Sequence, residues 1–455
     1  MFYHLRLLTQ DPEKWQRESN HPAFEIKRGF EISKMDKPRL RDVSLQSAVI
    51  NGTPMILLKD PEHFSGQTLC IPENEAMLFI LSRLDGEHSI VDIQADFMRR
   101  FGTLLMSDQI RSIVNTLSEN HFLDDEEFHA YRDSVIESFR ESPVRASLLA
   151  GTSYPADPGE IKNLLDSFIQ KARCAGGKEI PGPREQPRAL IAPHIDFARG
   201  GRVYGTVYDE ILGEEMPDLF VLLGTAHSPA SSLFIPTRKS FETPLGVAET
   251  DTELLSELER RVSPEKLYGE DFVHRGEHSI EFQILWLQHI YSGRRISILP
   301  ILCASYQNFI FKRMDPDQDP EFRNFLSALR SVLEKSGKNL MVIAGADLSH
   351  VGSSFGDPFS RGVPDAFLEQ VRRHDQTLLD AVGAGDAHLF FDTIASGKDC
   401  YRVCGLPPIY TLLTMLPIFL KSEDSRKITG KLIDYDQSLD QERTTSVSFA
   451  GMAFY

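Results

Sequence analysis

The chain is poor in cysteine and lacks the paired cysteines that typify disulfide frameworks and zinc ribbons. Its five cysteines are scattered, odd in number and form no C-x-x-C pair; they are Cys70, Cys174, Cys303, Cys400 and Cys404. A small disulfide scaffold is therefore excluded, and the free thiols fit a reducing compartment. We expect the protein to be cytoplasmic.

Long hydrophobic runs and a targeting segment are also absent from the sequence. The most apolar stretch, Leu406–Leu420, reads LPPIYTLLTMLPIFL, which is too short to span a bilayer and holds three prolines. We expect it to form a buried helix. The N-terminal MFYHLRLLTQDPEKWQ has no continuous apolar region, so we expect neither a signal peptide nor a membrane anchor.

Positive charge is in deficit, with 49 Lys and Arg against 66 Asp and Glu and a formal net charge of −17. This balance excludes nucleic acid and anionic membrane surfaces as the main partners. Apolar residues make up 41% of the chain and charged residues 25%, which is typical of soluble globular proteins. Since 455 residues exceed one ordinary core, we expect two or three domains.

Composition and rhythm divide the chain into three segments. We predict a weakly ordered extension over 1–36, a small module over 37–142 and an α/β domain over 143–455. In the module, AVINGTPMILLKDP indicates a β-hairpin with an Asn-Gly turn. Three stretches with helical spacing follow, which favours a winged-helix-like fold. The run LSRLDGEHSIVDIQADFMRRFG resembles the small PqqD-like modules, and this resemblance implies a unit that binds a peptide or a partner protein.

Beyond 143, short apolar runs alternate with amphipathic stretches. We predict strands in RALIAPH, DLFVLLGTAH, RISILPIL, NLMVIAGADLSH, KITGKLIDYD and SVSFAGMAFY. Helices are predicted in DTELLSELERRV, PEFRNFLSALRSVLEKSG and PDAFLEQVRRHDQTLLDAV. Such alternation predicts an α/β sheet covered on both faces.

The pentapeptide GEHSI occurs twice, at Gly86–Ile90 and at Gly276–Ile280. Turn chemistry accounts for the first copy, because an Asp-Gly turn precedes Ser89, which is a good N-cap for the helical pattern that follows. The second copy opens an apolar helix and has candidate ligands elsewhere in the domain, so we interpret Glu277 and His278 as part of a site.

Polar side chains follow three of the predicted strands. His194 comes just after the first strand of the domain and His227 just after the second, while Asp347 and His350 end the fourth. The carboxyl ends of strands in an open α/β sheet form the ligand crevice, so we expect these side chains to converge there.

Cys404 stands directly before the apolar helix at the C-terminal end of the domain. The helix dipole and Arg402 would both lower the pKa of its thiol, which predicts a thiolate ligand or nucleophile. Together His194, His227 and Cys404 form a sensible ligand set for iron, zinc or copper.

Seven motifs between Ala150 and Tyr455 resemble those of the Memo family and occur in the same order. They are AGTSYPADPGEIKNLL, APHIDFARGG, LGTAHSP, FETPLG…TD, GEHSIEFQ, DLSHVG and RVCGLPPIYTLL. Within that family the chain resembles the bacterial B proteins of the AmmeMemoRadiSam system. The resemblance implies a fold related to the LigB-type class III extradiol dioxygenases.

The same resemblance assigns roles to residues of this chain. It implies a metal held by His194, His227 and Cys404, with non-haem iron expected first and copper as an alternative; the ligand types also admit zinc. Asp347 and His350 would line the same pocket as catalytic residues, together with Cys404. Glu277 or His278 would orient a ligand from behind. Where animal members have two adjacent histidines, this chain has one histidine followed by serine, and their HAGY is HIDF here.

Three functions follow as hypotheses. The first is a mononuclear iron redox enzyme or oxygenase that acts with a radical-SAM protein and an Ammecr-type protein, on a small molecule or peptide. The second is a metal-binding adaptor of that system without catalysis. The third is a metal-assisted hydrolase with Cys404 as nucleophile and His350 as base.

Overall fold

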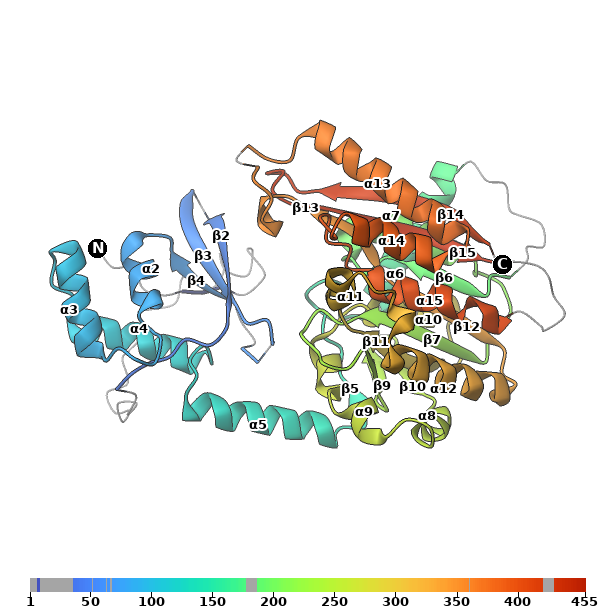
Figure 1. Ribbon diagram of the computed structural model, residues 1–455, viewed down its shortest axis with the longest axis horizontal. Helices are drawn as coiled ribbons and strands as arrows, with labels where there is room; N and C mark the ends of the chain where they lie inside the picture. The colour runs from blue at the N-terminus through green and yellow to red at the C-terminus, as the bar shows by residue number, and fades with distance from the viewer. Residues whose placement is uncertain are drawn as a thin grey trace. The chain divides into compact units, whose positions relative to one another are not determined.

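The computed structural model describes residues 6–8, 36–50, 52–62, 64–65, 68–176, 186–359, 361–419 and 429–455 (Figure 1). The chain divides into two compact units between Glu141 and Ser142, one residue from the boundary that composition predicts. The predicted extension over 1–36 lies outside the described residues, apart from Asp36 and a short strand at Arg6–Leu8.

The first unit is a four-stranded antiparallel sheet with helices packed against it. Its elements are β1 (Arg6–Leu8), β2 (Ser44–Ile50), β3 (Thr53–Lys59), β4 (Thr68–Pro72), α2 (Glu75–Ser82), α3 (Ile90–Phe101), α4 (Ser107–Glu119) and α5 (Glu126–Glu141). The strand order is β1-β4-β3-β2. Ile50 pairs with Thr53 across a turn in which Gly52 has φ 76°, so the predicted hairpin is confirmed. The PqqD-like identity of this unit stays a prediction.

The first GEHSI copy has the structural role that turn chemistry predicts. Ser89 caps α3: its hydroxyl oxygen accepts the backbone N–H of Asp92, and the Asp92 carboxylate accepts the backbone N–H of Ser89. Ile90, Ile93 and Phe97 of α3 are buried in the core of the unit. This copy therefore supplies a turn and a cap, and the interpretation is confirmed.

A buried ion pair fixes the turn after β3 in the first unit. The Asp60 carboxylate accepts bonds from both Nη atoms of Arg41, at 3.1 and 3.2 Å, and from the backbone N–H groups of Phe64 and Ser65, each at 2.8 Å. The Arg41 guanidinium lies 3.7 Å from the ring centroid of Phe128 in α5. The pair thereby ties α5 to the hairpin side of the unit.

Asp60→Asn should destabilise the first unit by about 1–3 kcal/mol, because it removes the buried carboxylate that accepts from Arg41 and from backbone N–H groups, and leaves the cation the exposed Glu62 as its anionic partner. Burial would raise the pKa of Asp60, but the bonds from Ser65 and Arg41 outweigh it and hold the pKa below 3.8. A lowered native pKa stabilises at neutral pH, and this contribution is lost as the pH falls through that pKa. Hydrogen exchange of peptides from 36–141 between pH 7 and pH 3 measures it; equal protection in the variant and wild type would contradict the assignment.

The second unit is built on a large mixed sheet with helices on both faces. Its strands are β5 (Val144–Arg145), β6 (Ala189–Ala192), β7 (Leu219–Thr225), β8 (Phe234–Pro236), β9 (Ser240–Thr243), β10 (Gly246–Thr250), β11 (Ser297–Cys303), β12 (Leu340–Gly345), β13 (Asp347–Val351), β14 (Gly430–Leu439) and β15 (Ser446–Phe454). Its helices are α6 (Pro158–Gly176), α7 (Phe197–Asp209), α8 (Thr252–Glu259), α9 (Pro264–Tyr268), η1 (Asp271–Gly276), α10 (Glu281–Ile290), α11 (Gln307–Lys312), η2 (Pro316–Gln318), α12 (Pro320–Ser336), η3 (Ser353–Phe355), α13 (Asp365–Gly383), α14 (Ala387–Ser396), α15 (Leu406–Met415) and η4 (Leu416–Phe419).

The strand order is β13-β15-β6-β12-β7-β11-β10-β9-β5, with β14 beside β15 and β8 beside β11. Strands β6, β12, β7, β11 and β10 are parallel, and β15 closes against β6 antiparallel. The parallel centre of the sheet brings the carboxyl ends of β6, β12 and β7 to one edge.

Alternate residues of the central strands pack in opposite directions. Leu219, Val221 and Leu223 of β7 join the core formed with α8, α12, α13, α14 and α15. Phe220 and Leu222 join the core formed with α6, α7 and α10. Both faces of the sheet are therefore covered by helices, as the alternation of strands and helices in the sequence predicts.

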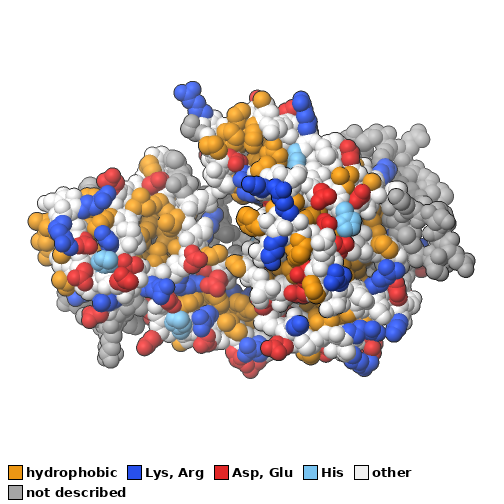
Figure 2. All heavy atoms as spheres, viewed as in Figure 1, with side chains coloured by type: hydrophobic (Ala, Val, Ile, Leu, Met, Phe, Trp, Pro, Cys, Tyr) orange, Lys and Arg blue, Asp and Glu red, His pale blue; other side chains and the backbone are white. Residues whose placement is uncertain are grey.

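The apolar stretch after Gly405 forms the buried helix α15, as predicted. Among the described helices none combines the length and the hydropathy needed to cross a bilayer. On the face shown in Figure 2, acidic and basic side chains are intermixed over both units.

Candidate metal centre

Two parallel strands that flank a third carry the first residues of the site. His194 follows β6 and His227 follows β7, while β12 lies between them and ends at Gly345. Gly345 is in register with Ala192 of β6 and with Gly224 of β7. The predicted convergence of His194 and His227 at one sheet edge is therefore what the topology produces.

The DLSH motif begins a strand of its own, whereas the sequence predicts that it ends the strand NLMVIAGADLSH. Asp347 and His350 belong to β13, which pairs antiparallel with β15 with a register shift between the two residues. The buried Asp347 carboxylate accepts bonds from the backbone N–H groups of His194, at 2.9 Å, and Ile195, at 3.3 Å. Asp347 thus fixes the backbone that carries the first histidine.

His194 is buried, with one ring nitrogen committed and the other available. Its Nδ1 lies 2.9 Å from the carbonyl of Gly345, so Nδ1 carries the proton and Nε2 keeps its lone pair. Nε2 lies 3.3 Å from Sγ of Cys404 and 3.7 Å from Oδ2 of Asp347. Burial and the neighbouring His227 lower the pKa of His194 to about 3, which keeps the ring neutral, as a metal ligand must be.

His227 is held by a buried carboxylate. Oε2 of Glu277 lies 3.0 Å from its Nδ1 and accepts its backbone N–H at 2.9 Å. Burial would lower the pKa of His227, but Glu277 outweighs it and the pKa is raised. Burial would likewise raise the pKa of Glu277, but His227 holds it well below its usual value. Glu277 is therefore an ionised carboxylate. Because it accepts the Nδ1 proton of His227, the lone pair of that ring is on Nε2, the nitrogen that a metal could bind.

His278 completes a cluster of three imidazoles. Its ring stacks on that of His227, with centroids 4.9 Å apart and planes 11° apart, and lies 5.5 Å from that of His194. One ring nitrogen from each of the three histidines lies within 4.8 Å of the others. Sequence reasoning gives His278 only a supporting role. The turn that carries it precedes α10, which begins at Glu281, and no sequence pattern indicates how far such a turn reaches.

Cys404 reaches the cluster through a close backbone approach. The N–H of Gly405 donates to the carbonyl of Asp347 at 3.0 Å, and a Cβ on Gly405 would lie 2.2 Å from that oxygen. Only glycine fits there, and it sets the neighbouring thiol 3.3 Å from His194.

The sequence predicts a lowered pKa for the Cys404 thiol, and this prediction is wrong, because the surrounding protein groups raise that pKa. Arg402 has φ 53°, and its guanidinium donates to Asp357 and to the carbonyl of His350 instead of facing the thiol. Burial and the nearby Asp347 carboxylate hold the pKa of Cys404 well above its usual value. The thiol therefore needs a cation in the site to ionise. Its nearest imidazole is that of His194, not that of the predicted base His350.

His350 lies at the edge of the cluster; neither it nor Cys404 belongs to the group of three mutually close histidines, but the Cys404 thiol contacts His194. Its Nδ1 lies 3.0 Å from the carbonyl of Leu348, and its backbone N–H donates to the carbonyl of Tyr401 at 2.7 Å. Burial lowers its pKa to about 4, partly offset by the charge of Asp347. This position suits a proton-transfer residue better than a ligand.

The donor set fits a borderline transition metal. Imidazoles and a cysteine thiolate are ligands that iron, zinc and copper accept, and the Nδ1 atoms of His194 and His227 are both occupied by acceptors. That arrangement leaves Nε2 of each ring for an ion, and a carboxylate or carbonyl behind the ring is the usual support for a metal-binding histidine.

A second group of possible ligands, Asp315, Asp317 and His388, has a different geometry. The two nitrogens of His388 lie 3.5 Å from different aspartates, and its side chain is exposed. In this arrangement each ring nitrogen faces a different carboxylate, as in a surface salt bridge.

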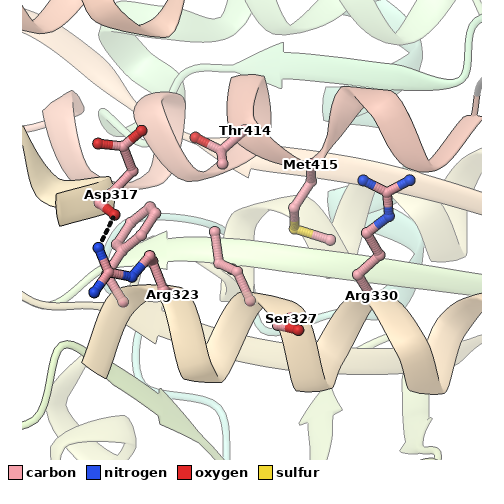
Figure 3. A pocket seen from close by; sticks show the side chains of 8 residues that line it. Asp317, Arg323, Ser327, Arg330, Thr414 and Met415 are labelled. Atoms are coloured by element: carbon pink, nitrogen blue, oxygen red, sulfur yellow. Dashed lines mark hydrogen bonds between the residues drawn. The ribbon is translucent and has the colours of Figure 1, made fainter. Parts of the chain in front are cut away.

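A hollow of about 370 Å³ lies between α12 and α15 (Figure 3). Its walls are formed by Asp317, Phe322, Arg323, Leu326, Ser327, Arg330, Thr414 and Met415. Arg323 donates to the carbonyl of Asp317, and Arg330 pairs with Glu334. Because its cations already have partners and it contains none of the clustered histidines, we place the candidate site at the histidine cluster.

The fold and the cluster define an α/β domain with a histidine-rich centre at the carboxyl ends of its strands. Comparison with known proteins identifies the domain: the Memo-like protein family matches residues 145–453, and the chain belongs to the Memo family. A MEMO1 family protein of Aquifex aeolicus is 29% identical over 419 residues, covering 92% of this chain and 100% of that protein. One from Thermus thermophilus is 28% identical over 361 residues, covering 79% and 97%.

Some relatives correspond in length to the second unit alone. A MEMO1 family protein of Archaeoglobus fulgidus is 26% identical over 317 residues, which cover 99% of that protein but 68% of this chain. The first unit is therefore an addition to a domain that makes up nearly the whole of other family members.

Proposed function

We propose that the chain is a mononuclear transition-metal protein of redox or oxygenase type, with non-haem iron as its metal. His194, His227 and Cys404 are the proposed ligands, and His278 lies beside them. The observation that carries the proposal is the orientation of the two rings, whose Nδ1 atoms are held by Gly345 and by Glu277. Copper and zinc are the alternative metals for the same donors.

The protein groups around the ion have separate tasks in this proposal. Bound iron would supply redox chemistry at a position that three protein ligands leave open. Glu277 keeps the proton of His227 on Nδ1, and Asp347 holds the backbone of His194. His350, at the edge of the cluster, would exchange a proton with a bound substrate.

The finer assignment within the family is also a proposal. The motif order supports a B protein of the AmmeMemoRadiSam system, working in the cytoplasm with a radical-SAM protein and an Ammecr-type protein. The first unit would be the docking part, since it carries most of the large apolar side chains that are exposed in the described chain. Those in the first unit are Leu45, Leu78, Val91, Met98, Leu104 and Met106. Exposed apolar side chains mark an interaction surface where they form one contiguous patch.

Anaerobic purification followed by metal analysis tests the proposal directly. We expect about one iron per chain in ferrous form, and oxygen consumption when air is admitted. Protein that carries no transition metal and cannot be loaded with one would refute the assignment. Metal-loaded protein that leaves oxygen untouched while binding the radical-SAM partner tightly would favour a second function, a non-catalytic adaptor.

His350→Ala should keep the full metal content, because the ring of His350 contacts the carbonyl of Leu348, whereas the thiol of Cys404 contacts His194 directly. Any activity should change its pH dependence, since a proton-transfer group at the edge of the site has been removed. Metal analysis and a pH–rate profile measure the two effects separately. Loss of the metal in this variant would instead make His350 a ligand.

Residues 142–455 expressed alone should fold, retain the metal and lose binding to the radical-SAM partner. The cut leaves Pro143 in place, whose carbonyl accepts the N–H of Ser240. Solubility, metal content and a pull-down with the partner measure the three properties. An insoluble fragment, together with a full-length chain that resists proteolysis between 126 and 150, would show that the two units form one core.

A further inference from the structure

A fully buried ion pair lies behind the turn that carries Glu277 and His278. Arg145 in β5 and Glu281 at the start of α10 form it, and their side chains are 1% and 0% exposed. β5 pairs with β9, so that the Arg145 guanidinium lies 5.2 Å from the ring of Phe241. A charge buried so completely needs every one of its partners.

Arg145 holds the turn by its backbone. Its Nε donates to the carbonyl of His274 at 3.0 Å, one Nη donates to the carbonyl of Glu277, and the other Nη pairs with Glu281. The planar guanidinium therefore joins three points of one chain segment, 274–281, in a single rigid fork.

Glu281 ties the same fork to the entry segment of the domain. Its carboxylate accepts the backbone N–H groups of Leu148, at 2.9 Å, and Leu149, at 3.0 Å, and also the hydroxyl of Tyr154. Segment 145–154 and segment 274–281 are thus locked together by one buried pair.

We infer that Arg145 is a positioning residue for the metal centre, an inference that rests on the proposed function. The Arg145 guanidinium fixes the backbone carbonyl of Glu277. The side-chain carboxylate of Glu277 in turn accepts the Nδ1 proton and the backbone N–H of His227. The carboxylate also accepts the N–H groups of His278, at 2.7 Å, and Ser279, at 2.9 Å. Arg145 therefore sets the placement of His227 and His278 through Glu277, without touching either ring.

Arg145→Lys tests whether the planar set of guanidinium donors is needed or the positive charge alone is enough. Lysine keeps a cation opposite Glu281 but cannot serve the two carbonyls and the carboxylate in one plane. We expect the full-length variant to fold and to bind Co²⁺ about tenfold more weakly than the wild type, with a changed visible absorption spectrum of the bound ion. Co²⁺ titration of the apoprotein gives both readouts, neither of which depends on catalytic activity.

Two further variants complete the experiment. R145M/E281Q removes both charges of the buried pair together, so it keeps the measurement possible if the lysine variant does not fold; it should show the same loss. Arg202→Lys is the matched control, because Arg202 also bridges carboxylates and a carbonyl, all of them on β14. It should bind Co²⁺ within about twofold of the wild type, since exposed ion pairs contribute little.

Wild-type affinity and a wild-type spectrum in both Arg145 variants would overturn the positioning role and leave the metal centre standing. Wild-type protein that takes up no Co²⁺ would overturn the proposed function and this inference with it.

Discussion

His194→Ala should lower the affinity for the metal by roughly 100-fold or more, because it removes a ligand that the fold holds in a single orientation. The backbone at this position is fixed independently of the ring, by the carboxylate of Asp347. The chain should therefore remain folded while it loses metal. His227→Ala and Cys404→Ala should behave in the same way if both are ligands. Metal analysis after equilibrium dialysis, with circular dichroism for the fold, measures the two properties.

His289→Ala is the matched control for these variants. His289 lies in the last turn of α10 and, like His227, has a carboxylate partner, with Nε2 3.1 Å from Asp166, but it is not part of the cluster. It should keep the full metal content. A triple variant of His194, His227 and Cys404 that still holds one equivalent would show that the assignment is wrong. His278→Ala decides whether the third protein ligand is an imidazole or the Cys404 thiol.

The part of the site that lies on the parallel strands could be predicted from the sequence. A buried strand followed by a histidine leaves little freedom, because the carboxyl ends of β6 and β7 must reach the same edge. His194 and His227 follow from that rule. The position of His278 could not be predicted in this way, since it lies in a turn between two helices and a turn has no periodicity that would show where its side chains point.

Two other features depend on contacts that are distant in the sequence. Asp347 and His350 form a strand because β15 pairs with them about a hundred residues later, and no local pattern announces this partner. The thiol of Cys404 lacks the expected cation because Arg402 turns to Asp357 in a left-handed conformation. Charge next to a residue in sequence is a weak predictor of charge next to it in space.

The first unit shows the same limit. Its hairpin follows from an Asn-Gly turn between two apolar runs, a purely local signal. Strand β1, by contrast, consists of three residues and exists through its pairing of Arg6 with Cys70 and Leu8 with Thr68. Short edge strands of this kind carry no pattern of their own.

Glu277→Gln should weaken metal binding by about 10–100-fold although the residue touches no metal in the proposal. A carboxylate presents only acceptors, and here they meet four N–H donors, from the backbone and Nδ1 of His227 and from the backbones of His278 and Ser279. A glutamine turns one of its two ends into a donor, which must then face another donor. One or more N–H groups lose their acceptor, at about 1–3 kcal/mol each.

The variant also removes the negative charge behind His227, so the ring becomes a poorer electron donor and its Nδ1 proton is no longer fixed. Glu270→Gln separates this effect from general loosening, because Glu270 also accepts backbone N–H groups, those of Ser231 and Ser232, but has no histidine partner. That control should lower the melting temperature without lowering metal affinity. Glu277→Asp should recover part of the affinity, since it restores the charge on a shorter side chain. If Glu277→Gln lost stability but bound metal as tightly as wild type, Glu277 would hold only the turn, and the orientation of His227 would have to come from the metal itself.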